Sequence, residues 1–76
     1  MTIITAHLAT WSSRGGKWTA LLETTSGGYR LSERKNGDEV GAAFRPETMF
    51  ANHYAAIAWA DEHVKNCFDV AMRRTS

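Results

Sequence analysis

The histidines are the candidate metal ligands of this chain, and they occur as His7, His53 and His63. His53 and His63 stand ten residues apart, which is roughly 1000° of rotation on a helix, so their rings would point in different directions. The chain also lacks the CxxC, HxxxH and HxxE spacings that are typical of metal sites. We therefore predict no metal site and expect the three histidines at or near the surface.

Cys67 is the one candidate nucleophile with a candidate base nearby, because His63 precedes it by one helical turn. No residue pattern supplies an oxyanion site or a third group that would orient the base. A cysteine that stands beside Phe68 is more typical of a buried structural thiol than of a reactive one. We predict the structural role.

The acidic residues Asp61, Glu62 and Asp69 are the remaining acid–base candidates, and we expect them to be solvated charges on a helix. The six glycines form no phosphate-binding pattern that leads into a helix. A domain of 76 residues buries only about 60% of the surface of its unfolded chain, so a deep catalytic pocket is hard to build. The sequence therefore predicts a protein without enzymatic activity and without a cofactor.

Composition limits the class of protein further. Apolar residues make up 43% of the chain and charged residues 22%, which is typical of a soluble globular protein, and the length predicts a single domain over 1–76. The net charge of +1 lacks the basic excess of a strong nucleic-acid binder. The chain has a single cysteine, no apolar run near the roughly 20 residues of a membrane span, and no signal-peptide pattern. These features predict a cytoplasmic protein with no membrane partner.

The first half of the chain has the alternation and β-branched content of strands, separated by glycine-containing turns. Ser26-Gly27-Gly28 predicts one tight turn. Asn36-Gly37 predicts a type I′ turn, in which both central positions need positive φ, and a slightly longer loop through Asp38 is the alternative. The expected strands cover 2–10, 17–25, 29–35 and 39–44.

The second half has helical periodicity. Apolar residues recur at three- and four-residue steps from Phe50 to Ala71, after Pro46, and Thr48 or Asn52 could cap the helix. A helix over 50–73 would be about 35 Å long, more than the expected sheet width, so we expect a break near Lys65-Asn66 and two helices. The fold class is α+β: a two-layer sandwich in which a four-stranded antiparallel meander packs against one or two C-terminal helices (ββββα or ββββαα).

The three tryptophans have different expected places. Trp18 lies on the apolar side of its strand and is expected in the core. Trp59 either fills the second side of the core or stays partly exposed as an interface anchor. Trp11 follows the first strand and is expected to cover one end of the sheet.

The sheet face that the helices leave uncovered is the candidate binding surface. Alternation predicts a mixed-charge face with Leu21 in its middle, made of Thr5, His7, Ala9, Lys17, Thr19, Leu21, Glu23, Arg30, Ser32 and Arg34. Such a face is either a solvated back or a recognition surface, and side chains on rigid strands bind with little ordering cost. The small net charge favours a protein partner over nucleic acid.

The order of elements, together with TAHL at 5–8 and NG-x-x-VGA at 36–42 before an aromatic residue and a helix, resembles small phage anti-CRISPR proteins that block type I surveillance complexes. The resemblance implies a non-enzymatic inhibitor that acts in the host cytoplasm, binds Cas subunits along the guide RNA and prevents pairing with target DNA. One similar family binds through tyrosines and an acidic residue of the outer sheet face. Glu23 and Glu33 fall near comparable positions, whereas the tyrosines are missing.

Two alternatives remain open. GKWTALLE at 16–23, GYRLSE at 28–33 and AAF-x-x-E at 42–47 before an Ala-rich helix resemble AP2-type and integrase-arm modules, which imply DNA binding through Lys17, Arg30 and Arg34. The third possibility is a structural or oligomerising domain whose edge strands pair between chains, so the chain is expected to be a monomer or a homodimer. The predicted partner-binding residues are Lys17, Thr19, Leu21, Glu23, Arg30, Glu33 and Arg34.

Overall fold

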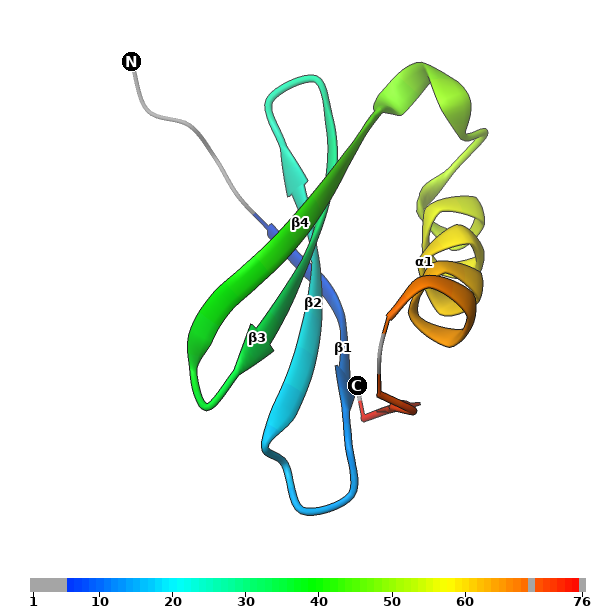
Figure 1. Cartoon of the computed structure of the whole chain (residues 1–76). Coiled ribbons are helices and arrows are strands. Elements are labelled where there is room, and N and C mark those ends of the chain that lie inside the picture. The colour runs from blue at the N-terminus through cyan, green and yellow to red at the C-terminus, as the bar shows by residue number, and fades with distance from the viewer. Residues whose placement is uncertain (1–5, 69, 76) are drawn as a thin grey trace.

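The computed structural model describes residues 6–68 and 70–75, which form one antiparallel sheet and one α-helix (Figure 1). Along the sheet the strands follow the order β4-β3-β2-β1-β5. The elements are β1 (Ala6–Ser12), β2 (Trp18–Thr25), β3 (Gly28–Lys35), β4 (Asp38–Pro46), the 3-10 turn η1 (Glu47–Met49), α1 (His53–Cys67) and β5 (Arg73–Arg74). The α+β class and the antiparallel order of the first four strands are confirmed, whereas β5 was not predicted.

The tight turn between β3 and β4 has the predicted geometry. Asn36 has a φ of 53° and Gly37 a φ of 87°, so both central residues occupy the left-handed region that an Asn-Gly step tolerates. This turn sets Lys35 opposite Asp38 and Arg34 opposite Glu39. The register of the next residues nevertheless changes, because β4 contains an irregularity.

Two β-bulges change which side chains face the helix. In β1 the register shifts between His7 and Ala9, so His7 lies opposite Glu23 and Ala9 opposite Leu22. Ala9 is therefore fully buried in the core, and the prediction that it lies on the uncovered face is wrong. In β4 the second bulge lies at Val40, because Arg34 is opposite Glu39 while Glu33 is opposite Gly41. Thr5 lies outside the described residues.

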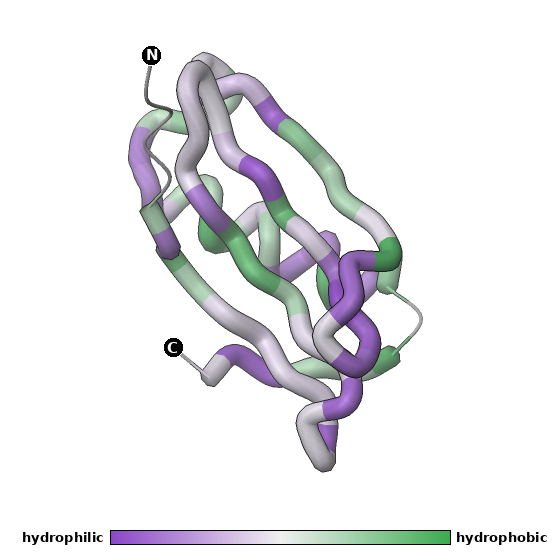
Figure 2. Tube along the Cα trace, turned by 90° about the vertical axis from the view of Figure 1, so that its left-hand side faces the viewer, coloured by the Kyte–Doolittle hydropathy of each residue, from purple (hydrophilic) through white to green (hydrophobic). Residues whose placement is uncertain are grey.

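The core lies between the sheet and α1 and consists of small and apolar residues. Ala56, Ala60 and Val64 recur at four-residue steps on α1, and the small alanine side chains let the helix approach β1 and β2 closely. Colours alternate repeatedly between hydrophilic and hydrophobic along the strands, as expected for a sheet with one buried face (Figure 2). The sheet contributes Ala9, Trp11, Ala20, Leu22, Tyr29 and Leu31.

The ends of α1 agree with the sequence only in part. Asn52 caps the helix, since its side-chain oxygen accepts a hydrogen bond of 3.0 Å from the Ala55 N–H, and Phe50 precedes the helix instead of beginning it. The helix ends at Cys67, close to the predicted break. The predicted second helix is wrong, because Arg73 and Arg74 instead pair with Ser12 and Trp11 at the open edge of β1. Met72 meanwhile packs against the core.

Three further predictions about single residues are corrected. Trp11 does not cover the end of the sheet but lies in β1 with 2% of its surface exposed. Its indole N–H donates to Asp61 Oδ1 at 2.6 Å, so Asp61 is more than a solvated charge. Cys67 is exposed and is not a buried thiol, because α1 turns this position away from the sheet. No helix in the described ranges is long and apolar enough to cross a lipid bilayer.

Trp18 and Trp59 are both partly buried, and each has a cation over its ring. The Lys35 ammonium lies 5.2 Å from the Trp18 ring centroid, and the Arg45 guanidinium lies 5.2 Å from that of Trp59. Trp59 also packs against the core cluster, which agrees with the alternative in which it fills the second side of the core. Trp59 thus lies at the periphery of the core, whereas Trp18, which was expected in the core, is only partly buried and is not part of the core cluster.

Candidate functional site

The sheet face turned away from α1, called the outer face below, carries most of the predicted binding residues. Residues directly opposite one another on antiparallel strands share a face, so the strand register identifies its members in three cross-strand rows. The first row holds Ser12, Thr19, Arg34 and Glu39; the second holds Thr10, Leu21, Ser32 and Ala42; the third holds His7, Glu23, Arg30 and Phe44.

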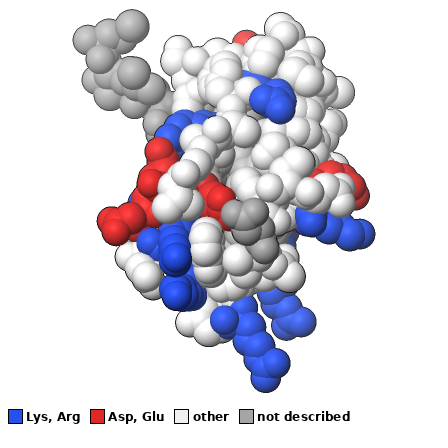
Figure 3. Space-filling model, in the orientation of Figure 1, with Lys and Arg blue, Asp and Glu red and all other residues white. Residues whose placement is uncertain are grey.

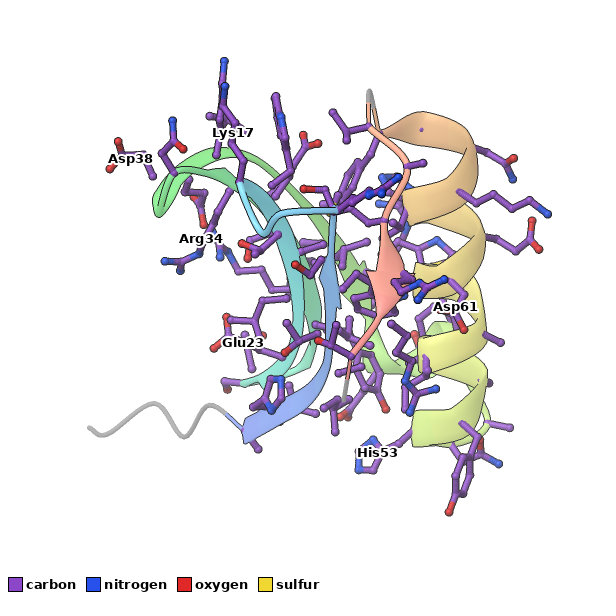
Figure 4. All side chains as sticks on the ribbon, turned by 90° about the horizontal axis from the view of Figure 1, so that it is seen from below. Lys17, Glu23, Arg34, Asp38, His53 and Asp61 are labelled. Carbon is purple, nitrogen blue, oxygen red and sulfur yellow. The ribbon has the colours of Figure 1, made fainter. Side chains whose placement is uncertain are left out.

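The register brings together five of the seven residues predicted from the sequence: Thr19, Leu21, Glu23, Arg30 and Arg34. In Figure 4, Glu23 and Arg34 point away from the helix, on the side of the sheet opposite Asp61. The sixth, Lys17, is exposed and directly precedes β2 at the rim of this face. The seventh, Glu33, lies on the other face, opposite Ala20 and Gly41, and is separated from the rest.

An ion pair crosses the outer face. Arg30 Nη2 lies 2.6 Å from Glu39 Oε1, and both side chains are about one-third exposed at 34% and 39%. The partners come from the third and first rows, so they reach across the middle row, where Ser32 is fully buried. An exposed pair of this kind contributes only about 0–1 kcal/mol to stability. Its main effect is to fix the positions of two charges on the face.

Phe44 supplies the large apolar group of the outer face and was not predicted. Its side chain is 51% exposed, and its ring lies beside Gly28, where a methyl group would come within 2.6 Å of Phe44 Cζ. A regular hairpin from the Asn36-Gly37 turn would place Phe44 opposite Tyr29, on the helix side. The bulge at Val40 moves it opposite Arg30 instead, so every β4 residue beyond the bulge changes face.

Arg34 has an unsatisfied donor. Its Nε is buried and has no hydrogen-bond partner among the described residues. A buried donor that is left without a partner costs about 1–3 kcal/mol. This buried donor stands in the row next to Leu21.

His63 is a titratable group that lies on the helix side among aromatic rings. The rings of Trp59 and Phe68 lie 5.4 Å from the His63 ring, measured between centroids. Burial, and secondarily the positive charge of Arg45, lowers the pKa of His63. Among residues 6–68 and 70–75, no three His, Cys, Asp or Glu side chains are grouped as metal ligands would be.

The outer face thus combines apolar side chains with charged ones. Leu21 and Phe44 provide apolar area, and charged side chains of both signs surround them. Comparisons of the chain with protein-family models, with curated proteins and with solved structures found no match. The function therefore has to be inferred from the geometry of this face.

Proposed function

We propose that the chain is a non-enzymatic binding protein that contacts another protein through the outer face. The observation that carries this proposal is an uncovered sheet face with the half-exposed Phe44 and a rim of Arg30, Arg34, Glu23 and Glu39. An aromatic anchor within a polar rim is the usual anatomy of a protein interface. Because the side chains stand on paired strands, little conformational entropy is lost on binding.

The charge pattern favours a protein over duplex DNA as the partner. Acidic and basic side chains are intermixed over β3 and β4 (Figure 3), and Arg30 is already paired with Glu39. Both Glu23 and Glu39 would face the DNA phosphates and repel them, whereas a protein can offer charges of either sign. The positive charges of Lys17, Arg30 and Arg34, the residues that the DNA-binding alternative would use, are thus offset by neighbouring acidic side chains.

The class of partner that we propose is a type I CRISPR surveillance complex, so that the protein would act as an anti-CRISPR inhibitor. Support comes from the sequence resemblance and from the uncovered outer face, which is the surface used by one similar family. The missing tyrosines imply different individual contacts, and Phe44 with the Arg34 guanidinium would provide them. Binding along the guide RNA would block pairing with target DNA without any chemical step.

The test is a phage-protection assay in cells that carry an active type I system, together with pull-down of the purified complex. We expect the wild-type chain to restore infection by a targeted phage and to retain the complex. The double charge reversal Arg30→Glu/Arg34→Glu should lose both activities. The matched reversal Arg14→Glu/Lys65→Glu, which changes the same number of charges at exposed residues of the β1–β2 loop and of α1, should keep both.

Three outcomes would overturn parts of this proposal. Failure of the wild-type chain to bind any type I complex would reject the anti-CRISPR assignment. Equal effects of the two double reversals would reject the outer face as the contact surface. Tight binding to random duplex DNA in a gel shift, with a steep loss as salt rises, would favour the DNA-binding alternative.

A further inference from the structure

A cavity lies at the end of the molecule where the β1–β2 loop meets the C-terminal strand, away from the centre of the outer face. Its volume is about 560 Å³, and the described residues that line it are Ser12, Ser13, Arg14, Ala71, Met72, Arg73 and Thr75. The pairing of Ser12 with Arg73 brings these two segments together. The pairing of β5 with β1 therefore holds the two sides of the cavity together.

The described residues that line the cavity carry positive charge. Arg14 and Arg73 are both exposed, and neither forms an ion pair with any described residue. No Asp or Glu is found among the described lining residues. In Figure 3, Lys and Arg side chains project from this lower end of the molecule, whereas over β3 and β4 they are mixed with acids. Two guanidinium groups at one cavity favour an anion.

The loop supplies a further donor. Ser13 Oγ accepts a hydrogen bond of 3.1 Å from the Trp18 N–H, so the proton of its own hydroxyl remains available to a ligand. Gly15 and Gly16 have φ values of 88° and 77°, which allow the tight loop in which the Gly16 N–H donates to the Ser13 carbonyl at 2.9 Å. The loop is thereby closed against the cavity with Arg14 at its rim.

We propose that this cavity binds the phosphate group of a small organic phosphate monoester, with Arg14 and Arg73 as the charged donors and the Ser13 hydroxyl as a third. Guanidinium groups match the oxygens of a phosphate with parallel hydrogen bonds. Ala71 and Met72 form an apolar wall, which a free inorganic ion would leave unused. The volume lies within the range of roughly 300–1,000 Å³ that is typical of small-ligand sites.

The experiment is a titration of the ¹⁵N-labelled full chain with adenosine monophosphate, followed by amide NMR, with adenosine and inorganic phosphate as parallel probes. We expect saturable shifts at 12–16 and 71–75 with the monophosphate and none with adenosine. The variant Arg14→Gln/Arg73→Gln should bind at least about tenfold more weakly, since each charge-assisted hydrogen bond contributes more than tenfold to affinity. Inorganic phosphate should shift the same amides at higher concentration.

Lys17→Gln is the matched control, because it removes one positive charge from the same loop at a residue that does not line the cavity. It should leave the affinity within about twofold. An equal loss in Lys17→Gln, shifts centred on the outer face, or binding of adenosine alone would each overturn the assignment. Absence of saturable shifts with the monophosphate, or tighter binding of a short single-stranded oligonucleotide than of the monophosphate, would overturn it as well.

Discussion

Single side chains connect the sheet to α1, and the Trp11–Asp61 hydrogen bond is the best defined of these connections. Trp11 is 2% exposed, so its indole N–H has almost no access to water, and Asp61 Oδ1 accepts its hydrogen bond at 2.6 Å. Sequence periodicity identified Asp61 as a solvent-facing position but gave no sign of this bond. The partner comes from β1, and which helix position faces Trp11 depends on packing that a one-dimensional pattern does not encode.

We expect Asp61→Ala to lower the free energy of unfolding by about 1–3 kcal/mol, because it leaves the buried Trp11 N–H without an acceptor. Asp61→Asn keeps an acceptor oxygen and should retain most of the stability. Urea unfolding followed by tryptophan fluorescence measures the change. The control is Lys65→Ala, an exposed residue one turn further along α1, with an expected change within about 0.5 kcal/mol. A loss no greater than that of the control would contradict the proposed role of the bond.

His63 should make the free energy of unfolding depend on pH. Its pKa is lowered from 6.5 by burial and then by Arg45, so the folded protein binds the proton less tightly than the unfolded chain does. As the pH falls below 6.5 the unfolded chain is protonated first, and the free energy of unfolding decreases. The contribution of neutral His63 to the free energy of unfolding is complete above pH 6.5. It is lost as the pH falls towards the lowered pKa of this residue in the folded state.

An NMR titration of the His63 ring measures this effect directly. Arg45→Gln removes the charged contribution and should raise the pKa of His63 towards 6.5, while the contribution of burial remains. His63→Gln should reduce the loss of stability below pH 6.5 in unfolding experiments. A pKa of His63 that does not respond to Arg45→Gln would show that the guanidinium has no influence on the ring.

At the scale of elements, local signals predicted the turns and the start of α1, and the missed features depended on tertiary contacts. Asn36-Gly37 formed the expected turn because positive φ is a property of those two residues. The bulge at Val40 has no comparable local signal, and it moved Phe44 to the outer face. The segment after Cys67 was expected to be helical but instead reaches the edge of β1, since an open strand edge can pair with any extended segment nearby.

The cap of α1 gives a prediction with a built-in control. Asn52→Ala removes the side-chain acceptor of the Ala55 N–H and should destabilise the protein by about 1 kcal/mol. The control is Thr48→Ala, at the other residue that the sequence offered as a cap. Thr48 lies in η1, before the helix, and is exposed. This substitution should change stability by less than about 0.5 kcal/mol. The reverse order of the two effects in thermal unfolding would place the start of α1 elsewhere.

At the scale of the whole molecule, the packing of one helix on one sheet face leaves at least two parts of the sheet uncovered. The outer face is one, and the open edge of β4 is another, with Val40 exposed on it. Asp38, Glu39 and the bulge at Val40 are features with which natural proteins prevent edge strands from pairing. They favour a monomer over the oligomerising alternative, in agreement with the proposed use of the outer face.

Sedimentation equilibrium tests this expectation about assembly. The chain should sediment with the monomer mass of 8.5 kDa across the micromolar range. A dimer mass that reverts to a monomer in Val40→Lys would show that β4 pairs between copies, and the contact surface would then have to be reconsidered.

The most direct test of the outer face compares two exposed aromatic residues on opposite sides of the molecule. Phe44 lies on the outer face with 51% of its surface exposed, and Tyr54 lies on α1 with 82% exposed. Binding is measured by surface plasmon resonance with an immobilised type I surveillance complex. Phe44→Ala should weaken binding at least about tenfold, because truncation of an aromatic anchor commonly costs about 2 kcal/mol of binding free energy. Tyr54→Ala should bind as the wild type does. Unchanged binding of Phe44→Ala together with a loss in Tyr54→Ala would contradict the account.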